Sequence, residues 1–283
     1  MSSRREAYLD ELFGLGDRVA LVTGASGTIG EALARGLAAS GARVALVARR
    51  AQPLEDLARS IRSAGGTASA FPADVLDRPA LEAVRSEVST QLGRLDILVN
   101  AAGGNTPEAT SPEGGSFFEL PDSAFKRVID LNLMGTVLPI QVFGTAMAAR
   151  EPEERSASIV NISSMAADRA ITRVAGYSAA KAAVDNLTRW LAATAARAYG
   201  GRLRVNAIAP GFFLGSQNRS LLLTPQGRPN ARARAIIERT PARRLGDPTE
   251  LVSAVIWLCG RGASFVTGTV VPVDGGFSAF SGV

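Results

Sequence analysis

The sequence predicts an α/β fold in which a single doubly wound parallel sheet of about seven strands carries helices on both faces. Short runs rich in Val, Ile and Leu alternate along the chain with longer, alanine-rich amphipathic segments. The short runs are apolar at successive positions, which is typical of strands that helices cover on both faces. A glycine-rich turn joins the first run directly to the first amphipathic segment, which favours a βαβ architecture.

The elements follow in order through the first half of the chain. Each expected strand has four or five mainly apolar residues, which is enough for a buried strand and too short for a helix. The segment after each strand has apolar residues three and four positions apart, the spacing of one helix face. Strands are therefore expected at residues 19–23, 43–47, 68–71 and 97–100, and helices at 29–39, 53–64, 78–91 and 124–149.

The second half continues this alternation, with two long interruptions. One is a Gly-, Pro- and Ser-rich loop at residues 103–121, and the other is an insertion at 211–240. Both follow a strand, and right-handed crossovers place the strand ends along one edge of the sheet, so both should border a ligand site there. The remaining strands are expected at residues 158–162, 204–208 and 270–273, and the remaining helices at 177–199 and 249–258.

Composition excludes several kinds of site. The chain has no histidine, which rules out a Ser-His-Asp triad and a histidine-based zinc site. It has one cysteine, Cys259, which can form neither an internal disulfide nor a thiolate cluster. We therefore expect no bound metal and a reducing, cytoplasmic environment.

Charge and hydropathy exclude two kinds of partner. Basic residues outnumber acidic ones by 31 to 26, but they are interleaved with acids and form no block. This favours an anionic cofactor or small-molecule substrate over nucleic acid. An uncharged run at residues 131–149 is long enough to raise the question of a membrane span. Asn132, Gly135 and Pro139 within it favour instead a buried helix of a soluble protein.

The turn after the first strand has the features of a phosphate-binding site. It reads Thr23-Gly-Ala-Ser-Gly-Thr-Ile-Gly30 and runs directly into a helix. Glycines let the backbone approach a pyrophosphate, and the free amides of the helix N-terminus stabilise its negative charge. The residues expected to contact a dinucleotide here are Gly24, Ser26, Gly27, Thr28 and Ile29.

The end of the second strand distinguishes between two dinucleotides. Ala48 stands where an acidic residue would accept hydrogen bonds from the adenosine ribose, and Arg49 follows it. A guanidinium can bind a 2′-phosphate through two hydrogen bonds. We therefore expect NADP(H) in preference to NAD(H), which stays open as the alternative.

A tyrosine and a lysine stand four positions apart at the start of a helical segment. Tyr177 and Lys181 therefore lie on one helix face. An ammonium one turn away favours the phenolate and should lower the pKa of the tyrosine toward neutrality. Ser164, just after the fifth strand, can donate to a substrate oxygen while the tyrosine transfers a proton.

With these features the sequence resembles the short-chain dehydrogenase/reductase family over almost its whole length, from residue 17 to residue 283. The resemblance implies a Rossmann-type fold and hydride transfer between a nicotinamide cofactor and a carbonyl or secondary alcohol. It implies that Tyr177 is the general acid/base and that Ser164 is the oxyanion partner. It also implies that Lys181 holds the nicotinamide ribose and that Asn132 anchors a water that relays protons to Lys181.

The same resemblance extends the set of cofactor contacts and suggests a division of the chain. We predict an N-terminal extension at residues 1–16 and a dinucleotide-binding catalytic domain at 17–283, with 211–240 as a substrate loop or lid. The added cofactor contacts are Asp74 and Val75 at the adenine, then Asn100, Ala101, Gly103, Pro210, Gly211 and Phe213, together with Tyr177 and Lys181.

Two positions depart from the family pattern. Thr28 replaces the middle glycine of the turn, so the phosphate loop is expected to differ in detail. Gly215 replaces a threonine that is often found five positions after Pro210, which removes one hydrogen bond to the nicotinamide amide.

Within the family, longer stretches are similar to the D-mannonate oxidoreductase (D-fructuronate reductase) branch. Examples begin at Asn100, Asn132 and Ala209. Such a substrate is a polyhydroxylated carboxylate, which a guanidinium can clamp and amides can recognise. The residues expected to bind it are Ser164, Asn105, Arg173, Gln217, Asn218 and Arg219.

Other hypotheses stay open at this point. The carbonyl substrate could instead be a 3-oxoacyl thioester, a simple sugar or a steroid-like ketone. A non-catalytic dinucleotide-binding protein could keep the fold, although it would have no need of the tyrosine–lysine pair. Surplus apolar surface on the helices at 131–149 and 177–199 predicts burial against another subunit, and the family resemblance implies that this surface forms a homodimer. By family resemblance, the uncharged C-terminal tail would complete a homotetramer.

Overall fold

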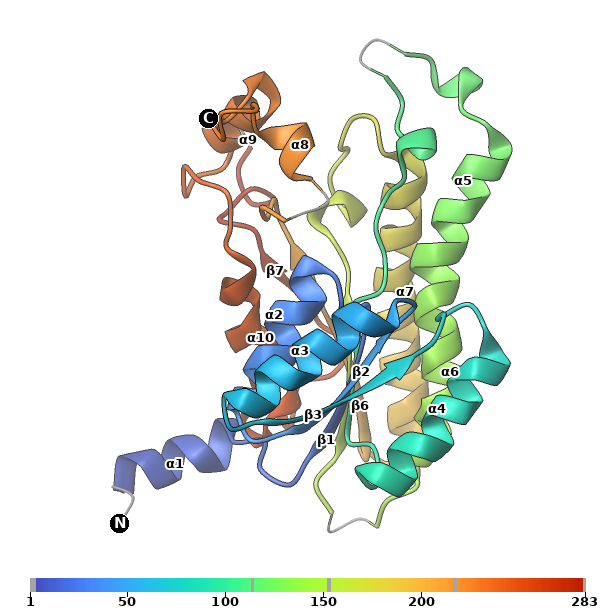
Figure 1. The fold of residues 1–283 in the computed structure, drawn as a ribbon, viewed down its shortest axis with the longest axis vertical. Coiled ribbons are helices and arrows are strands. Elements are labelled where there is room, and N and C mark those ends of the chain that lie inside the picture. The colour runs from blue at the N-terminus through green and yellow to red at the C-terminus, as the bar shows by residue number, and fades with distance from the viewer. Residues whose placement is uncertain (1–3, 113–114, 152–153, 216–217, 282–283) are drawn as a thin grey trace.

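Seven parallel strands form one sheet in the computed structural model, which describes residues 4–112, 115–151, 154–215 and 218–281 (Figure 1). The strand order is β3-β2-β1-β4-β5-β6-β7, and each neighbouring pair runs parallel. The predicted doubly wound α/β fold is therefore confirmed. The strands are β1 (Val19–Thr23), β2 (Arg43–Ala48), β3 (Thr67–Pro72), β4 (Ile97–Asn100), β5 (Ala157–Ile162), β6 (Leu203–Pro210) and β7 (Val270–Val273).

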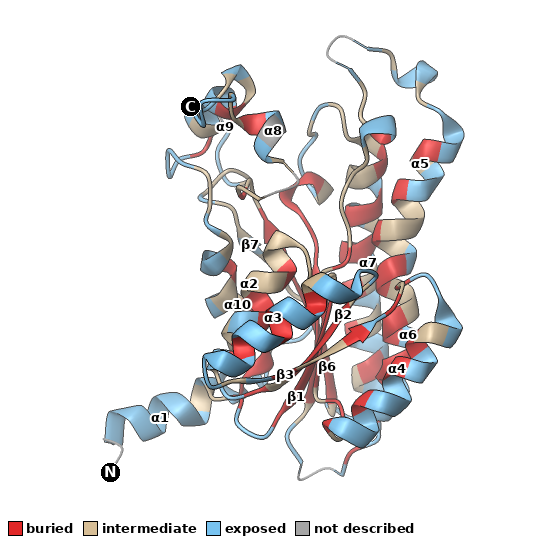
Figure 2. Cartoon of the chain, in the orientation of Figure 1, coloured by how far each residue is buried: buried red, intermediate tan, exposed pale blue. Residues whose placement is uncertain are grey.

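Helices cover both faces of this sheet (Figure 1). On α3, for example, Leu54, Leu57 and Ile61 are buried at helical spacing against one face. Figure 2 shows the buried residues concentrated in the sheet and on the helix faces that meet it. One face carries α2 (Thr28–Ala39), α3 (Ala51–Ser63) and α10 (Val252–Cys259), and the other carries α4 (Arg78–Gln91), α6 (Gly135–Ala148) and α7 (Ala175–Tyr199).

The helix expected at residues 124–149 is divided into two. α5 (Asp122–Ile129) leads into a π-helical turn at Asp130–Met134, and α6 follows. The whole stretch Asp122–Ala148 is long and apolar enough to cross a membrane, but 56% of its most apolar window is buried inside the protein. Phe143 and Met147 pack against the sheet, so the stretch is a core helix of this fold.

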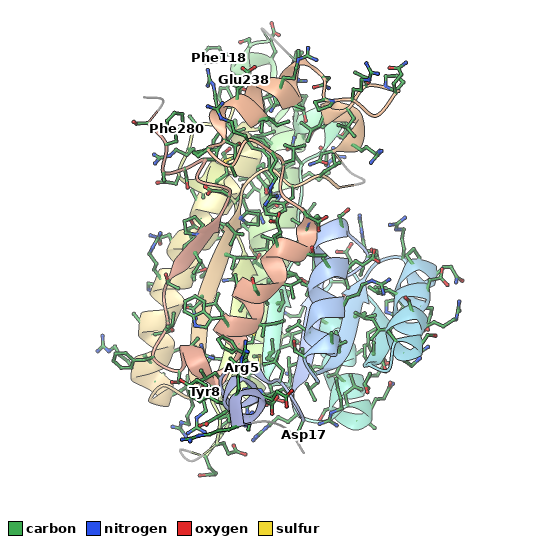
Figure 3. All side chains as sticks on the ribbon, turned by 90° about the vertical axis from the view of Figure 1, so that its left-hand side faces the viewer. Arg5, Tyr8, Asp17, Phe118, Glu238 and Phe280 are labelled. Carbon is green, nitrogen blue, oxygen red and sulfur yellow. The ribbon has the colours of Figure 1, made fainter. Side chains whose placement is uncertain are left out.

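Three helices were not expected from the sequence. α1 (Arg4–Phe13) buries none of its residues, and Figure 3 shows its Arg5 and Tyr8 at the opposite end of the molecule from Phe118 and Glu238. α8 (Arg219–Leu222) and α9 (Ala231–Arg239) lie within the insertion at 211–240. Short 3₁₀ turns occur at Pro107–Ala109, Phe117–Glu119, Met165–Ala167, Pro248–Leu251 and Arg261–Ala263.

An ion-pair cluster lies at the amino ends of the strands, opposite the ligand edge. Asp96, just before β4, is 2.8 Å from Nη2 of Arg150 and 3.8 Å from Nε of Arg18. The same carboxylate accepts a hydrogen bond of 2.8 Å from the N–H of Val19 in β1. Arg18 and Arg150 are both buried, so this one carboxylate holds two guanidinium groups that have little access to water.

Candidate active site

A cavity of about 920 Å³ opens at the carboxyl ends of the strands. Its walls come from the turn after β1, the ends of β2 and β3, the loop after β4, and the base of the insertion. We call residues 213–215 and Asn218 the insertion base. The predicted residues that line this cavity are Gly24, Ser26, Gly27, Thr28, Ile29, Arg49, Asp74, Val75, Ala101, Gly103, Phe213, Asn105 and Asn218.

The glycine-rich turn (residues 24–30) brings backbone rather than side chains to the cavity. Gly24 has a φ of +65°, and a Cβ there would lie 2.7 Å from the carbonyl oxygen of Ala101. A Cβ on Gly30 would lie 2.2 Å from the carbonyl oxygen of Gly24. α2 begins directly after Gly27, and Gly27, Ile29 and Gly30 line the cavity, so the N-terminal end of this helix faces a place that suits an anionic group. These residues therefore fit the pyrophosphate of a dinucleotide.

Asn100, Pro210 and Gly211 are not among the residues that line the cavity. Nδ2 of Asn100 donates to Oδ1 of Asn161 at 2.9 Å, and Nδ2 of Asn161 donates to Oγ1 of Thr188 at 2.9 Å. This buried chain ties β4 and β5 to α7. Asn161 and Thr188 were not predicted, because the hydrogen-bond partner of a polar residue inside an apolar strand or helix cannot be identified from the sequence.

The four predicted catalytic side chains come together beside the loop after β4. Nζ of Lys181 lies 5.6 Å from the centre of the Tyr177 ring, and Ser164 makes a hydrogen bond with Tyr177. A Cβ on Gly103 would lie 2.6 Å from Oδ1 of Asn132 and 3.2 Å from Nζ of Lys181. Asn132 and Lys181 therefore approach each other across a glycine that leaves room for both.

Hydrogen bonds hold Asn132 and Lys181 in place. Oδ1 of Asn132 accepts from the N–H of Gly104 at 2.9 Å, and its Nδ2 donates to the carbonyl of Gly104 at 2.7 Å. Lys181, which is 4% exposed, donates from Nζ to the carbonyl of Ile162 at 2.7 Å. The π-helical turn that contains Asn132 places its amide against the loop after β4.

The pKa of Tyr177 moves in the direction opposite to the one expected from the sequence. Burial raises this pKa, and the hydrogen bond with Ser164 only partly opposes the rise. Burial also lowers the pKa of Lys181 to about 8, although the carboxylate of Asp185 acts to raise it. The expected lowering of the tyrosine pKa by the ammonium was wrong, because desolvation dominates and Lys181 is not among the groups that shift the pKa of Tyr177.

Only some of the predicted substrate residues line the cavity. Nδ2 of Asn105 donates to Oγ1 of Thr110 at 2.6 Å, and Nε of Arg173 donates to the carbonyl of Ser111 at 2.8 Å. Arg173 has a φ of +77°, so its backbone is strained at this contact. Asn105 and Asn218 line the cavity, Arg173 and Arg219 are not among its lining residues, and Gln217 lies outside the described residues.

Several lining residues were missed in the sequence. They include Thr106, Leu131, Leu214 and Pro248. None belongs to a motif, and their place in the wall depends on how the loop after β4, the π-helical turn and the insertion fold over the sheet edge. Among the described residues, no group of three or more Cys, Asp or Glu side chains could hold a metal ion.

The chain is similar to known proteins over most of its length. The family model described as enoyl-(acyl carrier protein) reductase matches residues 24–278. The chain is 43% identical to the uncharacterised oxidoreductase UxuB of Bacillus subtilis (strain 168), over 95% of this chain and 98% of that protein.

Two solved structures are also similar to the chain over 95% of its length. One, from Haemophilus influenzae, is provisionally described as a D-mannonate oxidoreductase with bound NAD; it is 39% identical, with a TM-score of 0.87 and 98% of its chain covered. The other is a gluconate 5-dehydrogenase from Burkholderia cenocepacia J2315 in complex with NADP and tartrate, 32% identical, with a TM-score of 0.83 and 98% of its chain covered.

Proposed function

The chain belongs to the short-chain dehydrogenase/reductase family and is an NAD(P)-binding oxidoreductase, and we propose that it interconverts a keto sugar acid and the corresponding secondary alcohol. An example of such a pair is D-fructuronate and D-mannonate. The observation that carries the proposal is the placement of Tyr177, Lys181 and Ser164 together beside the dinucleotide-sized cavity. The sugar-acid assignment is further supported by the relatives described above.

Tyr177 is the proton donor in the direction of carbonyl reduction. Its raised pKa keeps the phenol protonated near neutral pH, where it can donate to the oxygen of the substrate. The hydroxyl of Ser164 holds that oxygen, and in the reverse direction the tyrosine takes the proton back. The nicotinamide ring, when bound, supplies or accepts the hydride.

Lys181 and Asn132 act on the tyrosine and the cofactor rather than on the substrate. The ammonium of Lys181 stabilises the phenolate that forms after proton donation, and it is positioned to hold the nicotinamide ribose. Asn132 anchors the loop after β4 at Gly104. Because Gly103 has no side chain, Asn132 and Lys181 both have room beside it. The water relay implied by the family resemblance would start at this asparagine.

The pH dependence of the reaction should respond to Asp185, which lies one turn after Lys181. Its carboxylate raises the pKa of Lys181, so Asp185→Asn should lower that pKa below about 8. Lys181 would then lose its proton at lower pH, and the alkaline limb of kcat/KM should move to lower pH. The groups that face Asp185 are Lys181, Arg189, Asp168 and Ser163.

A pH–rate profile between pH 6 and pH 10 measures this shift. Asp56→Asn is the matched control, because this carboxylate is exposed on α3 and is not among the groups that affect the pKa of Lys181 or of Asp185. An alkaline limb that stays in place in Asp185→Asn would contradict the assignment of that limb to Lys181.

For the cofactor we propose a preference for NADP(H). Arg49 lines the cavity at the end of β2, where the 2′-phosphate would lie. Arg49→Ser should weaken NADPH binding by about tenfold to a hundredfold and leave NADH binding nearly unchanged. Titration calorimetry with both cofactors measures this, with the exposed Arg59→Ser as control. Equal loss for both cofactors, or none, would mean that Arg49 does not bind the 2′-phosphate.

The substrate proposal is tested by absorbance at 340 nm with D-fructuronate and each reduced cofactor. Cofactor oxidation that requires D-fructuronate would support it. No turnover by protein that binds NADPH would exclude this substrate and direct the search to 3-oxoacyl thioesters, simple sugars and steroid-like ketones.

We also propose a cytoplasmic homodimer or homotetramer with no nucleic-acid or membrane partner. Trp190, which is 61% exposed, lies on α7, one of the helices whose surplus apolar residues predicted burial against another subunit. The tail packs on its own chain as far as described, since Phe277 contacts Phe212 and Arg169 donates to the carbonyl of Ser278. Light scattering of the intact protein and of a chain that ends before Phe277 tests the assembly.

A further inference from the structure

The first residue of α2 and the insertion base touch across the cavity. An ideal Cβ on Gly215 would lie 2.8 Å from Oγ1, 3.1 Å from Cβ and 3.4 Å from Cγ2 of Thr28. The first of these distances is shorter than non-bonded carbon and oxygen atoms approach in proteins. Thr28 and Gly215 both line the cavity. Thr28 therefore fills the place that a side chain at position 215 would need.

The insertion base cannot easily move back from this contact. Oδ1 of Asn218 accepts from the N–H of Gly215 at 2.8 Å, and Nδ2 of Asn218 donates to the carbonyl of Phe213 at 2.7 Å. The N–H of Leu214 also donates to the carbonyl of Gly246 at 3.3 Å. These hydrogen bonds hold the backbone on both sides of Gly215 in place and connect it to the segment before α10.

Thr28 is equally constrained. A β-branched side chain in a helix has few rotamers, and no rotation moves its Cβ, which lies 3.1 Å from the Cβ position of residue 215. Added volume at 215 must therefore displace either the glycine-rich turn or the insertion base. Both segments line the place where the pyrophosphate of the dinucleotide fits.

We propose that Thr28 is a positioning residue of the dinucleotide site: its side chain spans the gap between the glycine-rich turn and the insertion base, and Gly215 lacks a side chain because Thr28 occupies the space. Thr28 and Gly215 are the two positions that differ from the pattern implied by the family resemblance, and together they form one exchange: the turn carries a side chain here and the insertion does not. The inference rests on dinucleotide binding at this cavity and is independent of the sugar-acid substrate.

The exchange predicts strong coupling between the two positions. Gly215→Thr should weaken NADPH binding by about tenfold, because overpacking forces the turn and the insertion base apart. Thr28→Gly should also weaken it, by a similar factor, because the insertion base loses its support. The double variant Thr28→Gly/Gly215→Thr puts the side chain back on the other wall and should bind NADPH within about threefold of the unaltered protein.

Titration calorimetry with NADPH on these proteins tests the proposal, alongside thermal unfolding without cofactor. Gly16→Ala is the control for an added Cβ, because nothing lies within 4 Å of that position. Rescue by the second substitution is the expected result, and comparing Gly215→Thr with the double variant suffices even if Thr28→Gly does not fold.

Two results would overturn the proposal. One is unchanged NADPH affinity in Gly215→Thr, whether or not its unfolding temperature changes, since a purely structural contact would alter stability alone. The other is a double variant that binds no better than Gly215→Thr. Neither readout uses a carbonyl substrate, so failure of the sugar-acid proposal would leave this test intact.

Discussion

Tyr177→Phe is expected to lower kcat/KM by about a thousandfold while dinucleotide affinity stays close to that of the unaltered protein. The substitution removes one oxygen, the one that makes the hydrogen bond with Ser164. The ring and its contact with Lys181 remain, with Nζ 5.6 Å from the ring centre. General acid–base catalysis contributes about 10² to 10⁴ in rate, and no histidine in this chain could replace the phenol.

Steady-state kinetics and calorimetry with NADPH separate chemistry from binding in this variant. Tyr8→Phe is the control, since Tyr8 is 61% exposed on α1 and lies far from the cavity. Retention of more than about a tenth of the activity in Tyr177→Phe would mean that another group transfers the proton. Loss of cofactor binding with the activity would point to a structural role for the hydroxyl instead.

Asp96→Ala is expected to have the largest effect on stability, a loss of about 3–5 kcal/mol in the free energy of unfolding. The side chains of Asp96 and Arg150 are 13% and 2% exposed, so removal of the carboxylate leaves Arg150 and Arg18 charged and poorly hydrated. The N–H of Val19 also loses its acceptor. Chemical denaturation measures the change, and the unfolding temperature should fall by roughly 10 °C.

Asp56→Ala provides the matched comparison for this loss. Its ion pair with Arg59 is exposed and three positions apart on α3, and such pairs contribute well under 1 kcal/mol. Asp96→Asn separates charge from hydrogen bonding, because the amide oxygen can still accept from Val19. Equal stability of Asp96→Ala and Asp56→Ala would show that water or neighbouring carbonyl groups already satisfy the two arginines.

The strands and most helices were predictable because their signals are local. β1, β4 and β7 match the expected bounds, β2 begins at the expected residue, and β3, β5 and β6 begin one residue before it. The prediction of one continuous helix at 124–149 was wrong in one respect. Hydrophobic periodicity alone did not indicate the π-helical turn at Asp130–Met134. α1 was missed although Leu9, Leu12 and Phe13 have helical spacing, because its residues were assigned to an N-terminal extension; none of them is buried.

The sequence by itself determined the chemistry available to this protein. The absence of histidine, the glycine-rich turn and the spacing of Tyr177 and Lys181 depend only on residue identity and on helix periodicity. Together with the resemblance to the short-chain dehydrogenase/reductase family that these residues carry, they were enough to predict a nicotinamide-dependent oxidoreductase and the residues now found together beside the cavity.

Only the tertiary structure decided how those groups behave and which distant residues meet. The pKa of Tyr177 rises because the fold buries it, a desolvation that local spacing does not encode. The contact between Thr28 and Gly215 joins positions 187 residues apart, and each looked like a separate departure until the fold placed them against each other. Such contacts depend on chain topology, because packing excludes two side chains from one space whatever their distance in sequence.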